Sequence, residues 1–277
     1  MTHSYADVAR LLSDNGLAPR RAFGQNFVVD PNTVRRIARL ADVGPTDHVL
    51  EIGAGLGSLT IALAETGADI HAVEIDNGIV EVLRQVTAEL NNVRVIHDDA
   101  LTMDWVPLTE LSPHWHVVAN LPYNVATPLV ADLLDRVPQV QHMLVMVQRE
   151  VAERFVAVPR TAAYGAVSVK IGYWADARIV GDVPATVFFP KPKVASALVD
   201  IRRRPIPAVP DVVASELFAL VRAGFAQRRK MLRRALSGLV PQSAFTIAEV
   251  SPEARAEELD LQAWGRLCMA LHPLPKQ

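Results

Sequence analysis

The sequence predicts an α/β fold in which a doubly wound, mainly parallel sheet is followed by a small all-helical C-terminal domain. Strand-like and helix-like segments alternate from Val49 onward, which is the pattern of a parallel sheet. A glycine-rich turn, Gly53 to Gly57, separates the first strand of that series from its first helix. Prolines spaced along residues 205–210 end the series, and no strand-like run follows them.

These boundaries divide the 277 residues into two predicted domains. Residues 1–204 form the α/β domain, which carries an N-terminal arm at 1–30. Residues 211–277 form the helical domain, beyond a linker at 205–210. Half of the residues are hydrophobic, which is enough for a substantial core and argues against a disordered chain.

The N-terminal arm precedes the sheet. Tyr5 to Asn15 carries an apolar face and ends at Gly16, which predicts a short helix. The loop at 17–29 places two arginines next to two aromatic side chains, and we interpret it as an arm that docks on the core. Asp30 and Pro31 then predict the start of a helix, because aspartate caps a first turn and proline fits its first position.

The strands and helices of the sheet follow in a regular order. The predicted strands lie at 48–52, 70–74, 93–97, 115–119 and 142–147. The predicted helices lie at 58–66, 77–90, 126–136 and 149–157. Residues 164–174 fit either a helix or a strand by periodicity, and we favour a helix. Two further strands, 177–183 and 196–202, are expected to pair and close the edge of the sheet.

Bulk composition excludes several classes of protein. The net charge is −2, from 28 basic and 30 acidic residues, so the average charge argues against polyanion binding. The single cysteine, Cys268, excludes a disulfide framework and a multi-cysteine zinc site, and the eight histidines show no metal-binding spacing. No apolar run is long enough for a membrane span, and no signal peptide is evident. We therefore expect a soluble, cytoplasmic protein without a metal.

Each turn at the carboxyl end of a predicted strand offers a group that a nucleotide would use. Gly53 and Gly55 let the main chain approach a ligand closely. Glu74 ends the second strand, about twenty residues beyond the glycines, where a carboxylate accepts hydrogen bonds from ribose hydroxyls. Asp99 follows the third strand, where a carboxylate can accept a hydrogen bond from an adenine amine. Ser58 departs from the dinucleotide fingerprint, and no second nucleotide-binding half follows, so S-adenosylmethionine fits better than a dinucleotide.

A loop of distinctive composition follows the fourth strand. Asn120-Leu121-Pro122-Tyr123 resembles the loop of methyltransferases that modify exocyclic amines of nucleobases. Four further segments match one family in order: Phe23 to Phe27, Glu51 to Thr60, Phe188 to Ser196 and Phe225 to Lys230. Over nearly its whole length, the chain resembles the small-subunit ribosomal RNA adenine N6,N6-dimethyltransferases of the KsgA/RsmA type.

The resemblance implies a Rossmann-like class I methyltransferase sheet with a small helical domain that binds RNA. It also implies S-adenosyl-L-methionine as methyl donor, S-adenosylhomocysteine as product, and no metal. Asn26 and the backbone of Val28 would contact the methionine end of the cofactor, with Gly53 beside it. The complete set of implied cofactor-binding residues is Asn26, Val28, Gly53, Gly55, Glu74, Asp99 and Asn120.

The predicted catalytic loop suits an adenine amine, whose N6 lone pair is delocalised into the ring and is therefore a poor nucleophile. By the resemblance, Asn120 bridges cofactor and target, while its side-chain oxygen and the Leu121 carbonyl accept both amine hydrogens. Pro122 stiffens the loop and removes one backbone donor. Tyr123 is expected to cover one face of the unstacked base and Phe188 the other, with ordinary core packing as the alternative for both. Positioning then provides most of the catalysis.

A local concentration of basic residues contrasts with the acidic average. No acidic residue occurs from Leu217 to Ala248. On a continuous helix, Leu232 and its apolar neighbours would lie opposite most of the basic side chains. The alternative is a solvated amphipathic helix, but the absence of interleaved acids favours a phosphate-binding ridge. The RNA-binding residues expected there are Arg228, Arg229, Lys230, Arg233 and Arg234.

The sequence thus predicts an S-adenosylmethionine-dependent enzyme. By the resemblance, it dimethylates N6 of two adjacent adenosines near the 3′ end of 16S rRNA within the immature 30S subunit. It would act as a monomer and contribute to 30S biogenesis. Two alternatives stay open: a methyltransferase acting on large-subunit rRNA, and a ribosome-assembly factor without catalytic activity.

Overall fold

The computed structural model describes residues 2–271. Residues 1 and 272–277, which the sequence assigned to the arm and to the helical domain, lie outside the described residues. The chain divides into two compact units. The first comprises the chain up to Ala152 together with Arg178–Arg202, and the second comprises Glu153–Ala177 together with the chain from Arg203 onward.

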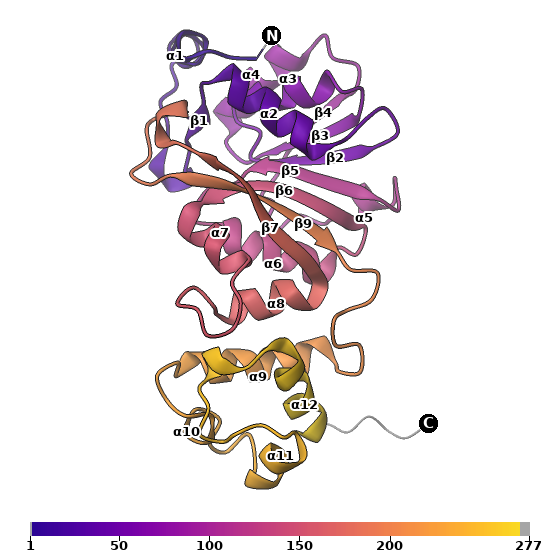
Figure 1. The fold of residues 1–277 in the computed structure, drawn as a ribbon. Helices are drawn as coiled ribbons and strands as arrows, with labels where there is room; N and C mark the ends of the chain where they lie inside the picture. The colour runs from indigo at the N-terminus through magenta and orange to yellow at the C-terminus, as the bar shows by residue number, and fades with distance from the viewer. Residues whose placement is uncertain (1, 272–277) are drawn as a thin grey trace. The chain divides into compact units, whose positions relative to one another are not determined.

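A seven-stranded sheet forms the centre of the first unit, in the order β4-β3-β2-β5-β6-β9-β7 (Figure 1). Its strands are β2 (His48–Ile52), β3 (Asp69–Glu74), β4 (Val93–His97), β5 (Trp115–Asn120), β6 (Val140–Gln148), β7 (Ala175–Val183) and β9 (Ser196–Arg203). The strands from β4 to β6 in this order run parallel, and β9 is antiparallel to β6. The predicted α/β class is confirmed, and the two late strands lie next to each other at one edge.

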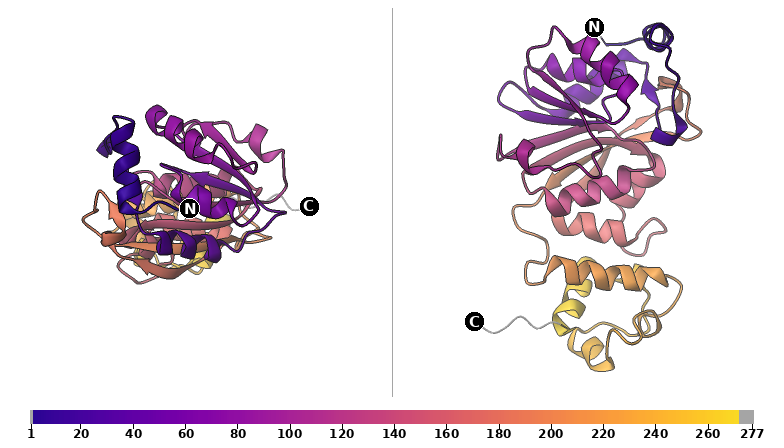
Figure 2. Two further views of the ribbon diagram at one scale, coloured as in Figure 1. Left: turned by 90° about the horizontal axis from the view of Figure 1, so that it is seen from above. Right: turned by 180° about the vertical axis from the view of Figure 1, so that it is seen from behind.

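Helices cover both faces of this sheet (Figures 1 and 2). One face carries α2 (Pro31–Ala41), α3 (Ser58–Ala64) and α4 (Asn77–Thr87), and the other carries α6 (Ala126–Arg136). The two helical layers explain why β2 is apolar throughout its middle, with Val49 and Leu50 buried. Helix α2 begins as predicted, because the Asp30 carboxylate accepts a hydrogen bond of 2.9 Å from the Thr33 backbone nitrogen.

The N-terminal arm consists of α1 (Tyr5–Asp14), the short turn η1 (Arg21–Phe23) and β1 (Phe27–Val28). β1 pairs antiparallel with β8 (Phe188–Phe189) in a separate two-stranded sheet. A satellite core fixes the arm on the glycine turn and on α4; its buried members are Val8, Leu12, Phe27, Leu56, Ile79 and Val82. The arm is therefore part of the packed first unit.

The second unit is helical. Its helices are α8 (Ala166–Trp174), α9 (Ala214–Ala226), α10 (Leu232–Ala235), α11 (Gln242–Ile247) and α12 (Leu261–Leu271). Trp264 is fully buried against Gly224, where an added Cβ would lie 2.5 Å from the indole ring. Within residues 2–271, no helix has the length and hydrophobicity that a membrane crossing requires.

Residues 153–177 belong to this second unit, whereas the sequence analysis placed them in the α/β domain. The reason is packing: Val169 and Tyr173 of α8 share a core with Phe218 and Leu220, which follow the linker. Sequence order suggested a single break at 205–210, but the second unit is built from two separate stretches of chain.

The prediction of a continuous basic helix around residues 228–236 is wrong. Residues 227–230 form a turn, and α10 comprises only Leu232–Ala235. Met231 between them is extended, caps the start of α10 and forms a β-bridge with Arg255, so no helix continues from the turn into α10. The basic side chains therefore project from a turn and a single helical turn rather than from one helical face.

Candidate active site

The glycine turn after β2 is in close contact with two other segments. Gly53 has φ +71°, and a Cβ added there would lie 3.4 Å from Pro122 of the loop after β5. Gly55 has φ +57°, and its added Cβ would lie 3.2 Å from the Phe27 ring of the arm. Both positions therefore favour glycine for conformation and for space, and they make the turn one wall of a cavity.

Glu74, at the end of β3, is buried and contacts this turn. Its side chain is only 6% exposed, and burial raises its pKa. The backbone nitrogen of Gly55 donates to Oε2 at 2.9 Å, and those of Ile75 and Asp76 donate to Oε1 at 3.0 Å. Three backbone donors thus fix the carboxylate; two of them occupy Oε1 and one occupies Oε2, which leaves Oε2 a second lone pair for a ligand.

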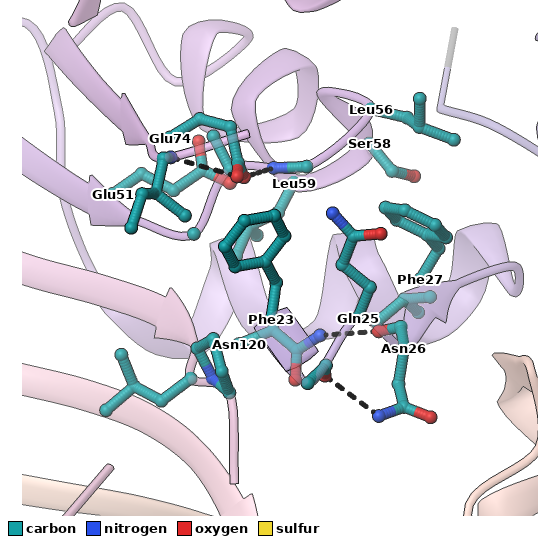
Figure 3. Close-up of a pocket in the computed structure, with 18 of the residues that line it drawn as sticks. Phe23, Gln25, Asn26, Phe27, Glu51, Leu56, Ser58, Leu59, Glu74 and Asn120 are labelled. Carbon is teal, nitrogen blue, oxygen red and sulfur yellow. Dashed lines mark hydrogen bonds between the residues drawn. The ribbon is translucent and has the colours of Figure 1, made fainter. Parts of the chain in front are cut away.

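Two adjoining hollows meet at this turn, and both are lined by Phe23, Gly53, Ile75 and Pro122. The first hollow is also lined by the predicted residues Asn26, Val28, Gly55, Glu74, Asn120, Leu121 and Tyr123. The second is also lined by Asp98, Asp99, Ala100 and Leu101. The structure therefore brings every cofactor-binding residue predicted from the sequence to one continuous region, part of which Figure 3 shows.

Asn120 ends β5 with its side chain held in one orientation. Its Nδ2 donates to the backbone carbonyl of Asn26 at 3.0 Å, which places the amide nitrogen toward the arm (Figure 3). The amide oxygen is consequently directed away from that carbonyl. The backbone nitrogen of Leu121 donates to Met146 at 3.1 Å and anchors the loop to β6. A contact from the arm thus determines how the predicted catalytic amide points.

Tyr123 lines the first hollow with its hydroxyl anchored. The hydroxyl hydrogen-bonds to the Ser196 hydroxyl at 2.7 Å, and Ser196 is completely buried at the start of β9. Burial raises the pKa of Tyr123, so the ring carries a neutral phenol. One edge of the ring is therefore fixed, and its orientation in the hollow is defined.

Phe188 does not face the cavity, where it was predicted to cover one face of the target base. It is 3% exposed and packs in the core with Val28, Val34 and Ile37, and it is absent from the lining of both hollows. The pairing of β8 with β1 turns Phe188 inward against α2. The alternative interpretation, ordinary core packing, describes this residue in the structure.

The arm is fastened near the site by Asp76, the N-cap of α4. Its buried carboxylate accepts from Gln25 Nε2 at 2.9 Å and from Arg20 Nη1 at 3.4 Å. Gln25 Oε1 in turn accepts from the Arg20 backbone nitrogen at 2.7 Å. In the view of Figure 3, the ring of Phe23 from the same arm lies between Glu74 and Asn120.

Sequence reasoning gave these supporting residues no role. Gln25 and Ser196 lie inside the segments that match the family, and Asp76 lies two residues after Glu74, but sequence spacing does not reveal which partner a side chain contacts. Glu51 was missed for the same reason: it lines the first hollow, burial raises its pKa to about 8, and its Oε2 has no hydrogen-bond partner among residues 2–271. Such an unsatisfied buried acceptor is costly unless a ligand supplies a donor or a positive charge.

The donor set fits a methyl-donating nucleoside. A buried carboxylate suits ribose hydroxyls, the hollow beside Asp99 has apolar walls from Phe23, Ile75 and Leu101, and the Glu51 acceptor suits a cationic group. At the glycine turn, the absence of Cβ atoms lets Pro122 and the Phe27 ring pack closely against the main chain that lines the hollow. The residues present are therefore compatible with S-adenosylmethionine.

The basic residues of the second unit differ in their surroundings. Arg228 is half-buried; its Nε donates to Glu257 at 2.6 Å and its Nη2 donates to the Ala162 carbonyl at 2.9 Å. Arg233 lies 3.7 Å from Glu253. Both acids follow Ala248 in the sequence, so the acid-free stretch did not reveal them. Three side chains are exposed and form no ion pair within the described chain: Arg229, Lys230 and Arg234.

The chain is similar to known ribosomal RNA methyltransferases over nearly its whole length. The family described as ribosomal RNA adenine dimethylase matches residues 16–271. Two relatives are named Ribosomal RNA small subunit methyltransferase A. That of Thermobifida fusca is 46% identical over 272 residues, covering 95% of this chain and 93% of the relative. That of Cutibacterium acnes is 45% identical over 280 residues, covering 96% and 93%.

Solved structures show the same fold. The 23S rRNA methyltransferase ErmE is 27% identical, with a TM-score of 0.67 over 88% of this chain and 99% of its own. A dimethyladenosine transferase from Plasmodium falciparum is 23% identical, with a TM-score of 0.71 over 86% of this chain and 94% of its own, and it supports the fold alone. Because the family match spans residues 16–271 and the named relatives are 45–46% identical over nearly their whole length, the chain belongs to the ribosomal RNA adenine dimethylase family.

Proposed function

We propose that this protein transfers two methyl groups from S-adenosyl-L-methionine to N6 of each of two adjacent adenosines near the 3′ end of 16S rRNA. The observation that carries the proposal is that Glu74, Asp99 and Asn120 line one continuous region around Gly53. The small-subunit target is supported by the relatives' name and by their identity of 45–46% with this chain.

The proposed cofactor roles follow from the surroundings of each carboxylate. Glu74, oriented by three backbone donors, accepts a further hydrogen bond at Oε2 from a ribose hydroxyl. Asp99 accepts from the adenine amine, between the apolar side chains of the second hollow. Asn26, Val28 and Gly53 border the methionine end. When bound, the cofactor supplies an electrophilic methyl group on a positively charged sulfur.

The N6 amine of the target adenosine is activated by the way in which the loop after β5 holds it. In the first transfer, the Asn120 Oδ1 and the Leu121 carbonyl accept the two N6 hydrogens, which favours a tetrahedral nitrogen whose lone pair points at the methyl group. In the second transfer, one of them accepts the remaining hydrogen. Each transfer breaks the bond between sulfur and methyl, leaves S-adenosylhomocysteine and releases one N6 proton to water. The contact between Asn120 and the Asn26 carbonyl preorganises this acceptor before the base arrives. Tyr123, held by Ser196, stacks on the unstacked base, a contact worth roughly 1–3 kcal/mol.

The RNA contacts of the second unit are proposed for its exposed cations. Arg229, Lys230 and Arg234 bind backbone phosphates, and Arg233 adds to them because its pair with Glu253 is exposed and weak. Arg228 instead maintains the fold through Glu257. We further propose that the protein acts as a monomer in the cytoplasm on immature 30S subunits and contributes to their biogenesis.

The test uses 30S subunits from a strain that lacks this methylation. The purified protein and S-adenosylmethionine should create two adjacent stops in primer extension near the 3′ end of 16S rRNA. No stop should appear without the cofactor or with the Asn120→Ala variant. Stops on 23S rRNA, or none on 16S rRNA with active cofactor binding, would contradict the proposed target.

The large-subunit alternative has one observation in its favour, the likeness to ErmE. That likeness is 27% in sequence, whereas the small-subunit relatives reach 45–46%. Offering 16S and 23S rRNA in the same reaction separates the two targets directly. An assembly factor without activity is distinguished by the absence of methyl transfer to either RNA.

A further inference from the structure

A second group of ligand-type side chains lies at the edge of the sheet away from the methyl-transfer site. The site follows the carboxyl ends of β2 and β3, whereas His48 and Asp69 are the first residues of these two strands. They face each other in the parallel register, and His71 lies two residues further on the same side of β3 as Asp69. Strand pairing thus gathers residues that spacing in the sequence keeps apart.

The two distances from Asp69 are close to those between neighbouring metal ligands and long for hydrogen bonds, including the weak hydrogen bond between Asp69 and His71. Oδ2 of Asp69 lies 3.4 Å from His48 Nδ1 and 3.4 Å from His71 Nε2, and the three atoms all lie within 4.8 Å of one another. In a tetrahedral zinc site with bonds of about 2.0–2.1 Å, neighbouring ligand atoms are roughly 3.3–3.4 Å apart. A good N–H···O bond has a length of about 2.9 Å. Among residues 2–271, His48 Nδ1 is buried and has no hydrogen-bond partner.

The surroundings orient both imidazoles. Trp115, 1% exposed, contacts both rings, with centroid distances of 5.2 Å to His48 and 5.0 Å to His71. His71 is buried, which limits the orientations its ring can adopt, and the neutral form of an imidazole is the one that binds a metal. Two imidazoles and one carboxylate form a donor set typical of zinc and similar transition metals.

The guanidinium of Arg94 contacts this group of side chains. Its Nη1 lies 3.4 Å from His71 Nε2 and its Nη2 lies 3.7 Å from Asp69 Oδ2. A guanidinium cannot share this position with a dication, so the two compete. The Arg94 side chain is 60% exposed and can move into solvent without breaking the core.

We propose that His48, Asp69 and His71 form a binding site for a transition-metal dication of the zinc class, with water completing the coordination and Arg94 as its internal competitor. The metal would join the amino ends of β2 and β3 and stabilise that edge of the sheet. It has no part in methyl transfer, because the reacting groups follow the opposite ends of these strands.

Calorimetric titration of the tag-free, chelator-treated full-length protein with zinc chloride tests the site. One equivalent should bind, and zinc at about a hundred times its Kd should raise Tm by roughly 5 °C. His48→Ala and Asp69→Asn should weaken binding at least tenfold. Arg94→Ala should tighten it roughly tenfold, since it removes a positive charge next to the metal. His114→Ala, an exposed histidine outside the group, is the matched control and should not change the affinity.

Cobalt offers a second measurement that does not depend on His71, whose replacement could unfold the chain. Cobalt binding should produce the visible absorption of a tetrahedral site and quench tryptophan fluorescence, and Trp115→Phe should remove most of the quenching while retaining the absorption. The proposal is overturned if zinc does not bind, or if it binds with the same affinity in His48→Ala and Asp69→Asn. It is also overturned if Arg94→Ala leaves the affinity unchanged.

Discussion

Asn120 illustrates how a single side chain is prepared for its role. Its amide nitrogen is used by the Asn26 carbonyl, so its oxygen is left to accept from a target amine. Asn120→Ala should reduce kcat for methyl transfer at least roughly a hundredfold, because a positioned acceptor is lost. Equilibrium binding should give an S-adenosylmethionine Kd within a few-fold of wild type. Near-normal turnover in this variant would remove Asn120 from the mechanism.

Ser196 is expected to act on the reaction through Tyr123. Ser196→Ala leaves the tyrosine hydroxyl without its partner, and we expect kcat/KM to fall about five- to tenfold, corresponding to roughly 1 kcal/mol. Tyr123→Phe should have a similar effect, and the double variant should be no worse than either single one. Additive losses would show that the two hydroxyls act independently.

Glu51 should make stability depend on pH. Burial raises its pKa to about 8 from an ordinary value of 4.5, so between these values the folded state holds a proton that the unfolded chain releases. Stability therefore falls as pH rises through this range. Denaturant unfolding without cofactor should show Glu51→Gln to be more stable than wild type at about pH 8, with the difference shrinking toward about pH 5. The exposed Glu65→Gln control should follow the wild-type profile; parallel curves for Glu51→Gln would contradict the assignment.

At the scale of the element, the arm is the feature on which the cavity depends. Gln25 connects the Arg20 backbone to the Asp76 carboxylate, and the same arm contributes Phe23 and Asn26 to the cavity. Gln25→Ala should raise the S-adenosylmethionine Kd roughly tenfold, because two hydrogen bonds that order the arm are lost. Gln85→Ala on the exposed side of α4 is the control. An unchanged Kd in Gln25→Ala would mean that packing alone fixes the arm.

The elements themselves were largely predictable. Strands β2 to β6 are short, apolar and separated by helices, and the Asp30-Pro31 start of α2 was evident because capping is a local property. The basic helix was not, because the extended conformation of Met231 depends on a bridge to Arg255. Phe188 was misplaced for a related reason: its burial is decided by the pairing of β8 with β1, which no periodicity reveals. Gly53, Glu74, Asp99 and Asn120 converge because parallel strands end at a common edge. Asn26 and Val28 reach the same region from the arm.

At the scale of the whole molecule, the net charge of −2 hides a local group of basic residues that is proposed to bind RNA. Arg229→Glu combined with Lys230→Glu should raise the Kd for 30S subunits at least roughly tenfold and flatten its dependence on salt concentration. Filter binding over a series of salt concentrations measures both quantities. Arg228→Gln is the matched comparison: it should lower Tm, because Glu257 loses its partner, and leave the salt dependence nearly unchanged. A flattened salt dependence in Arg228→Gln would place that residue on the RNA as well.

The interleaved path of the chain has a consequence for vectorial synthesis. Val169 and Tyr173 of α8 emerge from the ribosome before Leu217 and Trp264, their partners in the core, have been synthesised. The apolar side of α8 is therefore exposed to solvent during this interval. In the interval β9 emerges and completes the sheet of the first unit, and with it comes Ser196, the anchor of Tyr123. A nascent chain therefore acquires every residue of its methyl-transfer cavity before it acquires the cations proposed to hold the RNA.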